Sequence, residues 1–389
     1  MVSEDGAVIA EIPDGVQTVA LIGYGYWGPN LLRNYMDLPD VNVKWVCDLS
    51  PAALDKARRR YPTVQTTASV DDVFGDPEVD GVLIATPIGT HHQLCEAALL
   101  AGKHVFVEKP LTASAAQCAD LMALAATRDL TLMVGHTFIY SPPVRKVKEL
   151  IDAGELGEVR FVTMQRVNLG LHQKDASVIW DLAAHDLSIL DYWLGELPSV
   201  VSSMGRDCMH DGIPDVAFLT WQYPSGVVAL VHVSWLSPVK LRRTVVVGDR
   251  KMLVYDDTEP VEKVKVFDHG AEFKEPESFA EFQMVYHTGD IVSPKIATAE
   301  PLRLEAEHFM HCIGNGHDPI TNGAMGLRVV AALEAADASL REGVRKAIEL
   351  PDGHGVPAAV GPDGAAVSAA VAPGSDGAAA ASLGLSVLA

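Results

Sequence analysis

Residues 18–30 read Thr-Val-Ala-Leu-Ile-Gly-Tyr-Gly-Tyr-Trp-Gly-Pro-Asn, a buried-strand run that leads directly into a Gly-x-Gly-x-x-Gly turn. Each glycine of this turn has its own physical reason. Gly23 permits the tight turn, Gly25 lets a pyrophosphate approach the backbone, and Gly28 lets the next helix pack closely on the strand. The helix that opens near Pro29 offers unpaired N–H groups and a partial positive charge to phosphates. The stretch therefore predicts a strand–turn–helix unit that binds a dinucleotide.

An acidic residue, Asp48, follows Gly28 by twenty positions and stands at the expected end of the second strand. There its carboxylate would accept hydrogen bonds from the adenosine ribose hydroxyls and repel a 2′-phosphate. The other role for an acidic residue here, a helix N-cap, is already filled by Ser50 in front of Pro51. We therefore expect Asp48 to be free for the cofactor, with NAD preferred over NADP. The arginines at 58–60 lie two turns down the helix and are expected to form a solvated face.

Length, charge and cysteine content limit the class of protein. The chain has 389 residues, enough for two domains with complete cores, and a formal net charge of −21. That charge argues against nucleic acid or an anionic membrane surface as a partner, although a local pocket can still be positive. No apolar run reaches the length of a membrane span, and the acidic N-terminus lacks the pattern of a signal peptide. The five scattered cysteines form no CxxC pair, so we expect neither a disulfide framework nor a zinc site. We therefore expect the protein to be cytoplasmic.

The pattern of the chain changes near residue 136. Residues 16–135 alternate apolar strand runs with helical patterns, which is typical of a doubly wound parallel sheet. Residues 136–350 predict an α+β domain around a mainly antiparallel open sheet. One face of such a sheet needs a cover, so we expect a homodimer or homotetramer formed through it. Residues 352–389 shift to Ala, Gly, Pro, Ser and Val, which predicts a disordered tail.

Within these two regions, the periodicity predicts individual elements. The expected strands are residues 18–22, 43–47, 81–85, 104–107, 130–134, 159–167, 200–204, 217–223, 227–235, 243–247 and 251–255, and the expected helices include 93–101, 115–126, 145–153, 304–313 and 326–342.

The motif Glu108-Lys109-Pro110 follows an expected strand at the carboxyl edge of the sheet. Open α/β sheets build their ligand crevice at this edge. Pro110 stiffens the turn and permits a cis bond. A lysine at a strand end is usually a surface residue, but one held by proline at a cofactor crevice is a catalytic candidate. The spacing alone leaves both interpretations open.

Asp181 and His185 stand four residues apart at the start of a helix expected to run from Trp180 to Gly195. Both would project from one helical face near the N-terminus. The helix end and a nearby ammonium would favour neutral imidazole, which is the form that a general base needs. The alternative is a capping Asp181 with a structural His185, and the residues by themselves leave it open.

Thr86 and Pro87 end the expected strand at 81–85 and would lie beside the same crevice, near a nicotinamide. His91 and His92 follow at the start of a helix, where paired histidines are more often structural than catalytic. None of the histidine and cysteine positions offers a coherent ligand set, so we expect no metal.

Taken together, these residues resemble the glucose–fructose oxidoreductase/inositol dehydrogenase/rhizopine-catabolism (Gfo/Idh/MocA) family. The Glu-Lys-Pro motif is the specific one, whereas the glycine pattern is shared with many dehydrogenases. The similar motifs are Gly23-x-Gly25-x-x-Gly28, Ala85-Thr86-Pro87, Glu108-Lys109-Pro110, Gly135-His136 with Pro142, Leu150-Ile151-x-x-Gly154-x-x-Gly157 and Asp181-x-x-x-His185, with a weaker pattern from Glu307 to Gly314.

The resemblance implies a nicotinamide-dependent, metal-free oxidoreductase in which Lys109 and His185 are catalytic and Asp181 assists. It also implies two sets of contacts. The expected cofactor-binding residues are Gly23, Gly25, Tyr26, Trp27, Gly28, Asp48, Thr86, Pro87, His91, Glu108 and Lys109, and the expected substrate-binding residues are Lys109, His136, Tyr140, Arg166, Asn168, Asp181 and His185.

Within the family, the glycine turn and the Trp-Asp-Leu-x-x-His-Asp motif resemble the branch that acts on nucleotide-linked sugars, such as the UDP-N-acetylglucosamine and UDP-N-acetylglucosaminuronate 3-dehydrogenases. The resemblance implies hydride transfer at C3 of a nucleotide-linked hexose, in either direction. Ala183-Ala184 departs from that branch, which often has a proline before the histidine. Cations for a pyrophosphate would come from Arg166 and Lys174.

Two alternatives stay open. One is a free polyol, inositol or keto-sugar oxidoreductase of the same family. The other is a non-catalytic NAD-binding regulator, which would have no reason to keep Lys109 and His185 in their motifs.

Overall fold

A computed structural model describes residues 17–170, 176–273, 284–351 and 353. The chain divides into two compact units after Gly355, and all the described residues belong to the first. The expected disordered tail, except for Gly353, and the candidate cation Lys174 lie outside the described residues. Within these ranges, no helix combines the length and the apolar character that crossing a membrane requires.

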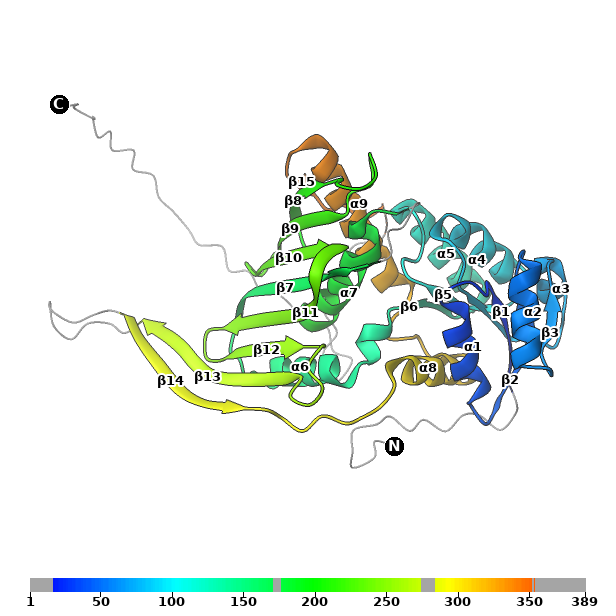
Figure 1. Ribbon diagram of the computed structural model, residues 1–389, viewed down its shortest axis with the longest axis horizontal. Coiled ribbons are helices and arrows are strands. Elements are labelled where there is room, and N and C mark those ends of the chain that lie inside the picture. Colours follow the sequence, from blue (N-terminus) through cyan, green and yellow to red (C-terminus); the bar gives the residue numbers. More distant parts are fainter. Residues whose placement is uncertain (1–16, 171–175, 274–283, 352, 354–389) are drawn as a thin grey trace, which may run out of the picture. The chain divides into compact units, whose positions relative to one another are not determined.

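The N-terminal part is a six-stranded parallel sheet with the order β3-β2-β1-β4-β5-β6 (Figure 1). The chain builds outward from β1 on one side and then from β4 on the other, so the topological switch point lies between these two strands. In open α/β sheets, ligands bind at the carboxyl ends of the strands around such a point. The strands are β1 (Gln17–Ile22), β2 (Val41–Cys47), β3 (Gln65–Thr67), β4 (Gly81–Ile84), β5 (His104–Glu108) and β6 (Leu132–Gly135).

Helices cover both faces of this sheet, which explains why β4 and β6 are buried at every position. Ser50 caps the helix that follows β2 and accepts a hydrogen bond from the backbone N–H of Ala53, as the sequence predicted. The helices are α1 (Gly28–Met36), α2 (Pro51–Arg60), α3 (Val70–Phe74), α4 (His91–Leu100) and α5 (Ala115–Arg128), with a 3-10 turn η1 (Ile88–Thr90) before α4.

The C-terminal part is a nine-stranded sheet with the order β14-β13-β12-β11-β7-β10-β9-β8-β15. All neighbours are antiparallel except β7 and β10, which pair in parallel. The sheet is therefore mainly antiparallel, as expected. Its strands are β7 (Val159–Leu169), β8 (Val200–Arg206), β9 (Val216–Gln222), β10 (Val228–Ser234), β11 (Leu236–Gly248), β12 (Met252–Asp256), β13 (Val264–Phe273), β14 (Met284–Val292) and β15 (Lys346–Ala347).

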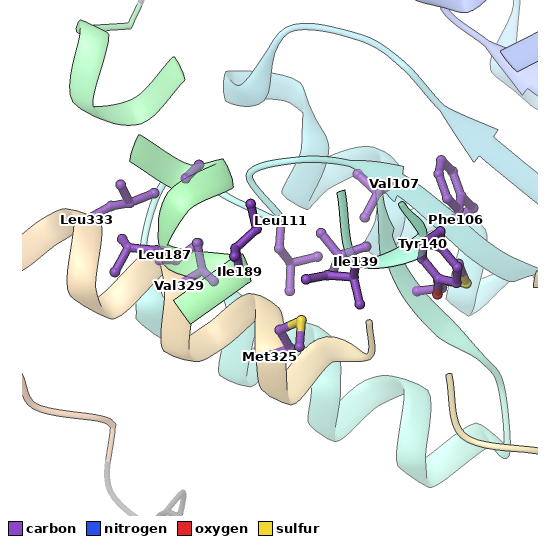
Figure 2. Packing of buried hydrophobic residues seen from close by; sticks show 14 of the residues in the cluster. Phe106, Val107, Leu111, Ile139, Tyr140, Leu187, Ile189, Met325, Val329 and Leu333 are labelled. Carbon is purple, nitrogen blue, oxygen red and sulfur yellow. The ribbon is translucent and has the colours of Figure 1, made fainter. Parts of the chain in front are cut away.

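The helices of this part join the two sheets into one core. They are η2 (Thr137–Tyr140), α6 (Pro142–Asp152), α7 (Ala184–Leu194), α8 (Pro301–Asn315) and α9 (Gly323–Glu342). Helix α9 contacts β8, α7 and α5, and α8 contacts α1. Figure 2 shows Met325, Val329 and Leu333 of α9 facing Leu187 and Ile189, with Ile139 and Leu111 beside them. Residues on both sides of position 136 thus share a continuous apolar cluster.

The other face of the nine-stranded sheet, which we call the open face, carries exposed apolar side chains. Phe161, Met204, Phe218 and Leu230 are between 40% and 74% exposed. The strand register places Phe218 opposite both Met204 and His232, and the ring of His232 stacks on Phe218 at 4.3 Å between centroids. These residues therefore form one apolar surface on the described part of the sheet.

The structure corrects three sequence expectations about elements. Strands β3, β13, β14 and β15 and helix α3 were not predicted, and β11 begins seven residues earlier than the expected 243. The helix expected from Trp180 begins with a π-helical turn, η3 (Ile179–Ala183), and only then continues as α7 to the left-handed Gly195. This turn belongs to the site described next.

Candidate active site

The glycine turn lies at the carboxyl end of β1. Gly23 has a φ of +98°, and a Cβ there would lie 2.5 Å from the carbonyl oxygen of Ala85. A Cβ at Gly28 would lie 2.2 Å from the carbonyl oxygen of Gly23. A Cβ at Gly25 would meet nothing within 4 Å. Close packing thus requires glycine at 23 and 28, whereas Gly25 leaves open space where a phosphate would approach the backbone.

Asp48 lies against this turn, at the end of β2. Its Oδ2 accepts a 2.6 Å hydrogen bond from the backbone N–H of Tyr24, and its Oδ1 accepts a 2.7 Å bond from that of Ser50. Both carboxylate oxygens therefore have a backbone partner, which the sequence did not predict. These bonds hold the carboxylate in one orientation and leave its remaining lone pairs for ribose hydroxyls. Tyr26 and Trp27, also expected at the cofactor, are 82% and 36% exposed on the same turn.

The Glu-Lys-Pro turn follows β5, and its Lys109–Pro110 bond is cis. Lys109 Nζ donates to the backbone oxygen of Asp181 at 2.8 Å and faces its Oδ1 at 3.3 Å. The lysine side chain is only 16% exposed. Lys109 is therefore a fixed cation in the fold and not a surface residue.

Glu108 precedes the lysine. Burial raises the pKa of its carboxyl to about 7, against the opposing effects of Lys109 and a hydrogen bond from the Trp27 side chain. The glutamate is thus poised between its neutral and charged forms near neutral pH.

The π-helical turn places Asp181 between Lys109, which follows β5 of the parallel sheet, and Trp235, which follows β10 of the mainly antiparallel sheet. Besides Lys109, its carboxylate accepts a 3.0 Å hydrogen bond at Oδ2 from Trp235 Nε1, at the end of β10. Asp181 N–H donates to the carbonyl oxygen of Ser177. Sequence reasoning missed Trp235, since no local motif marks a strand-end tryptophan as part of a site.

His185 follows one turn later and is half-buried. Phe138 lies edge-on to its ring, with 5.0 Å between centroids. Burial, and then the positive charges of Lys109 and Arg166, lower the pKa of His185 well below its usual 6.5. The imidazole is therefore neutral at physiological pH, as a general base requires.

Three cations flank His185, and each faces a carboxylate. Lys109 faces Asp181; Arg166 Nε donates to Asp186 Oδ1 at 2.9 Å; and Arg242 Nη1 donates to Asp257 Oδ2 at 3.2 Å. Both guanidinium groups lie over the ring of Phe138, at 4.5 Å and 5.7 Å from its centroid. Phe138 and Arg242 were not predicted; Phe138 lies within the segment from Gly135 to Pro142 that carried the resemblance.

Several expected contact residues are placed elsewhere. Tyr140 is fully buried and its hydroxyl pairs with Thr321 Oγ1 at 3.1 Å, so it is a core residue and not a substrate contact (Figure 2). Arg166 is buried and bonded to Asp186 Oδ1 through Nε and Nη2, whereas its Nη1 has no hydrogen-bond partner among the described residues. Asn168 is half-buried on the face of β7 that also carries Arg166.

His136, expected at the substrate, is fully buried, and neither ring nitrogen has a hydrogen-bond partner among the described residues. Burial, with the nearby charge of Lys109, lowers its pKa to about 3. His136 is therefore a neutral, buried imidazole near Lys109.

His91, expected to contact the cofactor, connects two turns of the site. It is 1% exposed, and its ring nitrogens lie 2.8 Å from the carbonyl oxygen of Thr86 and 2.9 Å from that of Pro110. This burial corrects the expectation that it binds cofactor. The Thr86–Pro87 turn that it supports is partly exposed at the end of β4.

Beneath the site lies a buried acid, Glu305 of α8. Its Oε2 accepts a 2.8 Å hydrogen bond from Thr137 Oγ1, whereas its Oε1 has no partner in the described structure. Burial and repulsion by Glu108 raise its pKa well above 4.5. Among the residues that the structure describes, no group of three or more His, Cys, Asp or Glu is placed to hold a metal ion.

The fold and the site together define a two-domain protein with a dinucleotide-binding sheet and a polar Lys-Asp-His group at its crevice. The chain belongs to the Gfo/Idh/MocA family. The family model described as "Oxidoreductase family, NAD-binding Rossmann fold" matches residues 17–136, and the one described as "GFO/IDH/MocA C-terminal domain" matches residues 144–254. The N-terminal part is therefore an NAD-binding Rossmann domain.

Individual relatives are more distant. The chain is 28% identical to the 2,7-anhydro-N-acetylneuraminate hydratase of Escherichia coli over 54% of this chain and 60% of that protein. It is 25% identical to the inositol 2-dehydrogenase of Rhizobium meliloti over 84% and 96% of the two chains. The alignments span only 50–65% of the length of three of the curated relatives.

Among solved structures, the UDP-N-acetylglucosamine 3-dehydrogenase GnnA from Acidithiobacillus ferrooxidans has a TM-score of 0.69 at 23% identity. The comparison covers 84% of this chain and 98% of that one. At this identity the likeness shows a shared fold.

Proposed function

We propose that this chain is an NAD-dependent oxidoreductase that interconverts a secondary hydroxyl and a ketone on a sugar or polyol. The observation that carries this proposal is the group of Lys109, Asp181 and His185, held together at the carboxyl end of β5 in a family with an NAD-binding domain. When bound, NAD⁺ supplies the acceptor for the hydride that leaves the carbinol carbon.

The protein's own groups then have separate tasks. His185, neutral for the reasons given above, removes the proton from the hydroxyl. Lys109 donates a hydrogen bond to the oxygen as negative charge develops there, and its charge also opposes protonation of the imidazole. Asp181 orients the lysine through its backbone and side-chain oxygens. The reverse reaction uses the same groups, with imidazolium as the acid.

The residues present fit the cofactor. The open space at Gly25 and the α1 N-terminus suit the pyrophosphate, and the fixed Asp48 suits the ribose of NAD. Exposed Tyr26 and Trp27 flank this turn, and the Thr86–Pro87 turn and Glu108 border the place expected for the nicotinamide. A carboxylate at position 48 repels a 2′-phosphate, so we propose NAD rather than NADP.

Two substrate classes are compatible with this chemistry. The resemblance to nucleotide-sugar enzymes favours C3 of a nucleotide-linked hexose, the substrate class in the name of the GnnA protein. The engagement of Arg166 by Asp186 favours the alternative, a free sugar or polyol, as in the name of the inositol 2-dehydrogenase.

We also propose that a second copy of the chain covers the open face, because this contiguous apolar surface has the character of a self-complementary interface. We place the protein in the reducing cytoplasm; all five of its cysteines are free, four of them buried.

The decisive test is NAD reduction, followed by absorbance, across a panel of free sugars, polyols and nucleotide sugars, with wild type beside His185→Ala. Turnover of at least one compound that falls by about 10²–10⁴-fold in the variant is the expected result. Absence of turnover on the whole panel, with NAD still bound, would support the non-catalytic regulator instead.

A further inference from the structure

The carboxyl group of Glu108 lies at the crevice but has no part in the acid–base group of Lys109, Asp181 and His185. Glu108 ends β5 and directly precedes Lys109, yet the ammonium of that lysine bonds to Asp181. In the described part of the chain, no ion pair involves Glu108, and its Oε1 is shielded from solvent without a hydrogen-bond partner. The carboxyl is therefore buried without a cation bonded to it.

The same carboxyl packs against the neighbouring strand and against the glycine turn. A Cβ at Gly135, at the end of β6, would lie 3.1 Å from both Cδ and Oε2 of Glu108, so the absence of a side chain there makes room for the carboxyl. The side chain of Trp27, in the glycine turn before α1, donates a hydrogen bond to Glu108. The carboxyl thus contacts the turn that we assign to the cofactor.

The other ionisable groups near Glu108 bring it no positive charge. Glu305 of α8 is a second buried carboxyl, and the two acids repel each other. Tyr35 of α1 is fully buried, and its hydroxyl has no partner among the described residues. His136 follows β6 and is neutral, because its pKa lies at about 3. Lys109 is thus the described cation that acts on Glu108, and its ammonium is bonded elsewhere.

A buried carboxylate with no bonded cation is costly, so such a group takes up a proton instead. In agreement with this, burial raises the pKa of Glu108 to about 7, although Lys109 and Trp27 oppose the rise. Near neutral pH, a change of charge close to Glu108 would therefore move it from one form to the other. As a residue Glu108 is half-buried, so exchange of its proton with solvent requires no opening of the core.

The two oxidation states of a nicotinamide cofactor differ in charge, because the ring is positive in NAD⁺ and neutral in NADH. Glu108 borders the place that we propose for this ring. A positive charge nearby favours the carboxylate, and loss of that charge favours the acid. NAD⁺ therefore brings the cation that Glu108 lacks in the free protein.

From these observations we infer that Glu108 is a cofactor-linked proton site, which releases a proton to solvent when NAD⁺ binds and keeps it when NADH binds. In the bound complex, alcohol, NAD⁺ and the Glu108 carboxylate then give ketone, NADH and the Glu108 acid. The hydride goes to NAD⁺, the proton that His185 removes passes to solvent, and Glu108 takes one proton up. The inference rests on the proposed function for the place of the cofactor, but not for the substrate.

The test measures cofactor binding to the full-length protein by isothermal titration calorimetry, without substrate. NAD⁺ and NADH are each titrated at pH 7 in phosphate and in Tris. These buffers differ in their heat of ionisation, so the difference in observed heat gives the number of protons released. Glu108→Gln removes the proton site and keeps the size of the side chain. Glu305→Gln is the matched control, since this second buried carboxyl bonds to Thr137 and not to the glycine turn.

Wild type should release about 0.4–0.5 proton per NAD⁺ at pH 7, because an opposite charge nearby lowers a carboxyl pKa by about 1–3. NADH should release none. Glu108→Gln should abolish the release, and Glu305→Gln should keep it. At pH 8, where most of Glu108 is ionised in wild type, Glu108→Gln should weaken binding of NAD⁺ relative to NADH by about 10-fold, the equivalent of a pKa change of one.

A measurement on wild type alone covers the case in which Glu108→Gln binds NAD⁺ too weakly to titrate. The release should vanish at pH 9, where Glu108 is already ionised. Release that instead grows toward pH 9 would identify the Lys109 ammonium as its source and overturn the inference.

The remaining outcomes separate this inference from the proposed reaction. Equal release with NAD⁺ and NADH, release that persists in Glu108→Gln, or release that Glu305→Gln abolishes as fully would overturn the inference. Glu108-dependent release in a protein that turns over no compound of the sugar panel would refute the proposed reaction and leave Glu108 assigned. Turnover without such release would support the reaction and refute the proton site.

Discussion

Lys109 and Asp181 are joined twice, because one ammonium group faces both the backbone oxygen, at 2.8 Å, and the carboxylate, at 3.3 Å, of the same residue. The lysine follows a strand of the Rossmann sheet and the aspartate belongs to the π-helical turn before α7. The ammonium is thereby held at a defined place beside His185. A hydrogen bond to the backbone of Asp181, and not only an ion pair between two side chains, fixes the position of the charge.

Replacing the lysine should remove most activity. We expect Lys109→Ala to lower turnover by at least about 10²–10⁴-fold, the range typical of one acid–base group, with NAD affinity retained. Steady-state kinetics and a fluorescence titration with NADH measure the two effects. Lys148→Ala is the control, since Lys148 pairs with Asp152 on the surface of α6. Rates within a few-fold of wild type would exclude Lys109 from the chemistry.

The pH dependence of kcat/KM should show that the imidazole of His185 is neutral. Because the pKa of His185 is lowered below 6.5, kcat/KM for alcohol oxidation should stay level as the pH falls through 6.5 and decline only at lower values. Lys109→Met removes a neighbouring positive charge, so it should raise the pKa of His185. NMR titration of the histidine ring in wild type and variant checks this without relying on activity. An unchanged titration would show that the lysine does not act on the imidazole.

Cofactor selectivity should depend on the charge at position 48. Asp48→Asn keeps an acceptor for the N–H of Tyr24 but removes the charge that repels a 2′-phosphate. We expect the ratio of kcat/KM for NAD over NADP to fall by about 10-fold, a change of about 1.4 kcal/mol. Asp55→Asn, an exposed partner of Arg58 on α2, serves as control. A ratio that does not move would leave Asp48 a purely structural residue.

Glu305 should make the protein less stable as the pH rises. The pKa of Glu305 is raised in the folded protein. Its contribution to the free energy of unfolding is therefore fully present below the unfolded pKa of 4.5, and it is lost as the pH rises toward the folded pKa. The slope is about 1.4 kcal/mol per pH unit for one proton. Glu305→Gln keeps an acceptor for Thr137 and should therefore stabilise the protein more at pH 8 than at pH 5.

Urea unfolding at the two pH values measures this difference. Glu158→Gln, whose side chain is 75% exposed, provides the comparison. Equal effects of Glu305→Gln at both pH values would mean that the buried carboxyl is already ionised at pH 5.

The open face should control assembly. A charge at Leu230, in the centre of this apolar surface, should shift the protein toward the monomer in sedimentation velocity. Leu230→Asp is compared with Leu100→Asp, at a similarly exposed position on α4. If both variants sediment like wild type, another surface, or none, forms the oligomer.

The Rossmann half was largely predictable because its signals are local. The glycine turn, the Ser50 cap and the fully buried strands each follow from a few adjacent residues, and the expected strands agree with the observed ones within a few residues. The elements missed in the second half are weakly patterned. Strand β13 mixes charged residues and a glycine into its ten residues, and β15 has only two residues.

The site was predictable in its members but not in its pairings. Lys109, Asp181 and His185 belong to motifs, so the sequence identified them. The engagement of Arg166 by Asp186 depends on how β7 packs against α7, and no local pattern encodes it. The same holds for Trp235, which reaches Asp181 from the end of β10 across 54 residues.

The histidine that opens α4 has a consequence for protein engineering. Since His91 connects the backbone of Thr86 with that of Pro110, the loop after β4 and the loop after β5 form one mechanical piece. If the loop after β4 were replaced by that of a relative, the new loop would lose the contact with His91 unless the first turn of α4 were transferred with it. Variant libraries at residues 86–90 should therefore keep His91 unchanged. Otherwise, substitutions chosen to alter cofactor preference would also move Lys109.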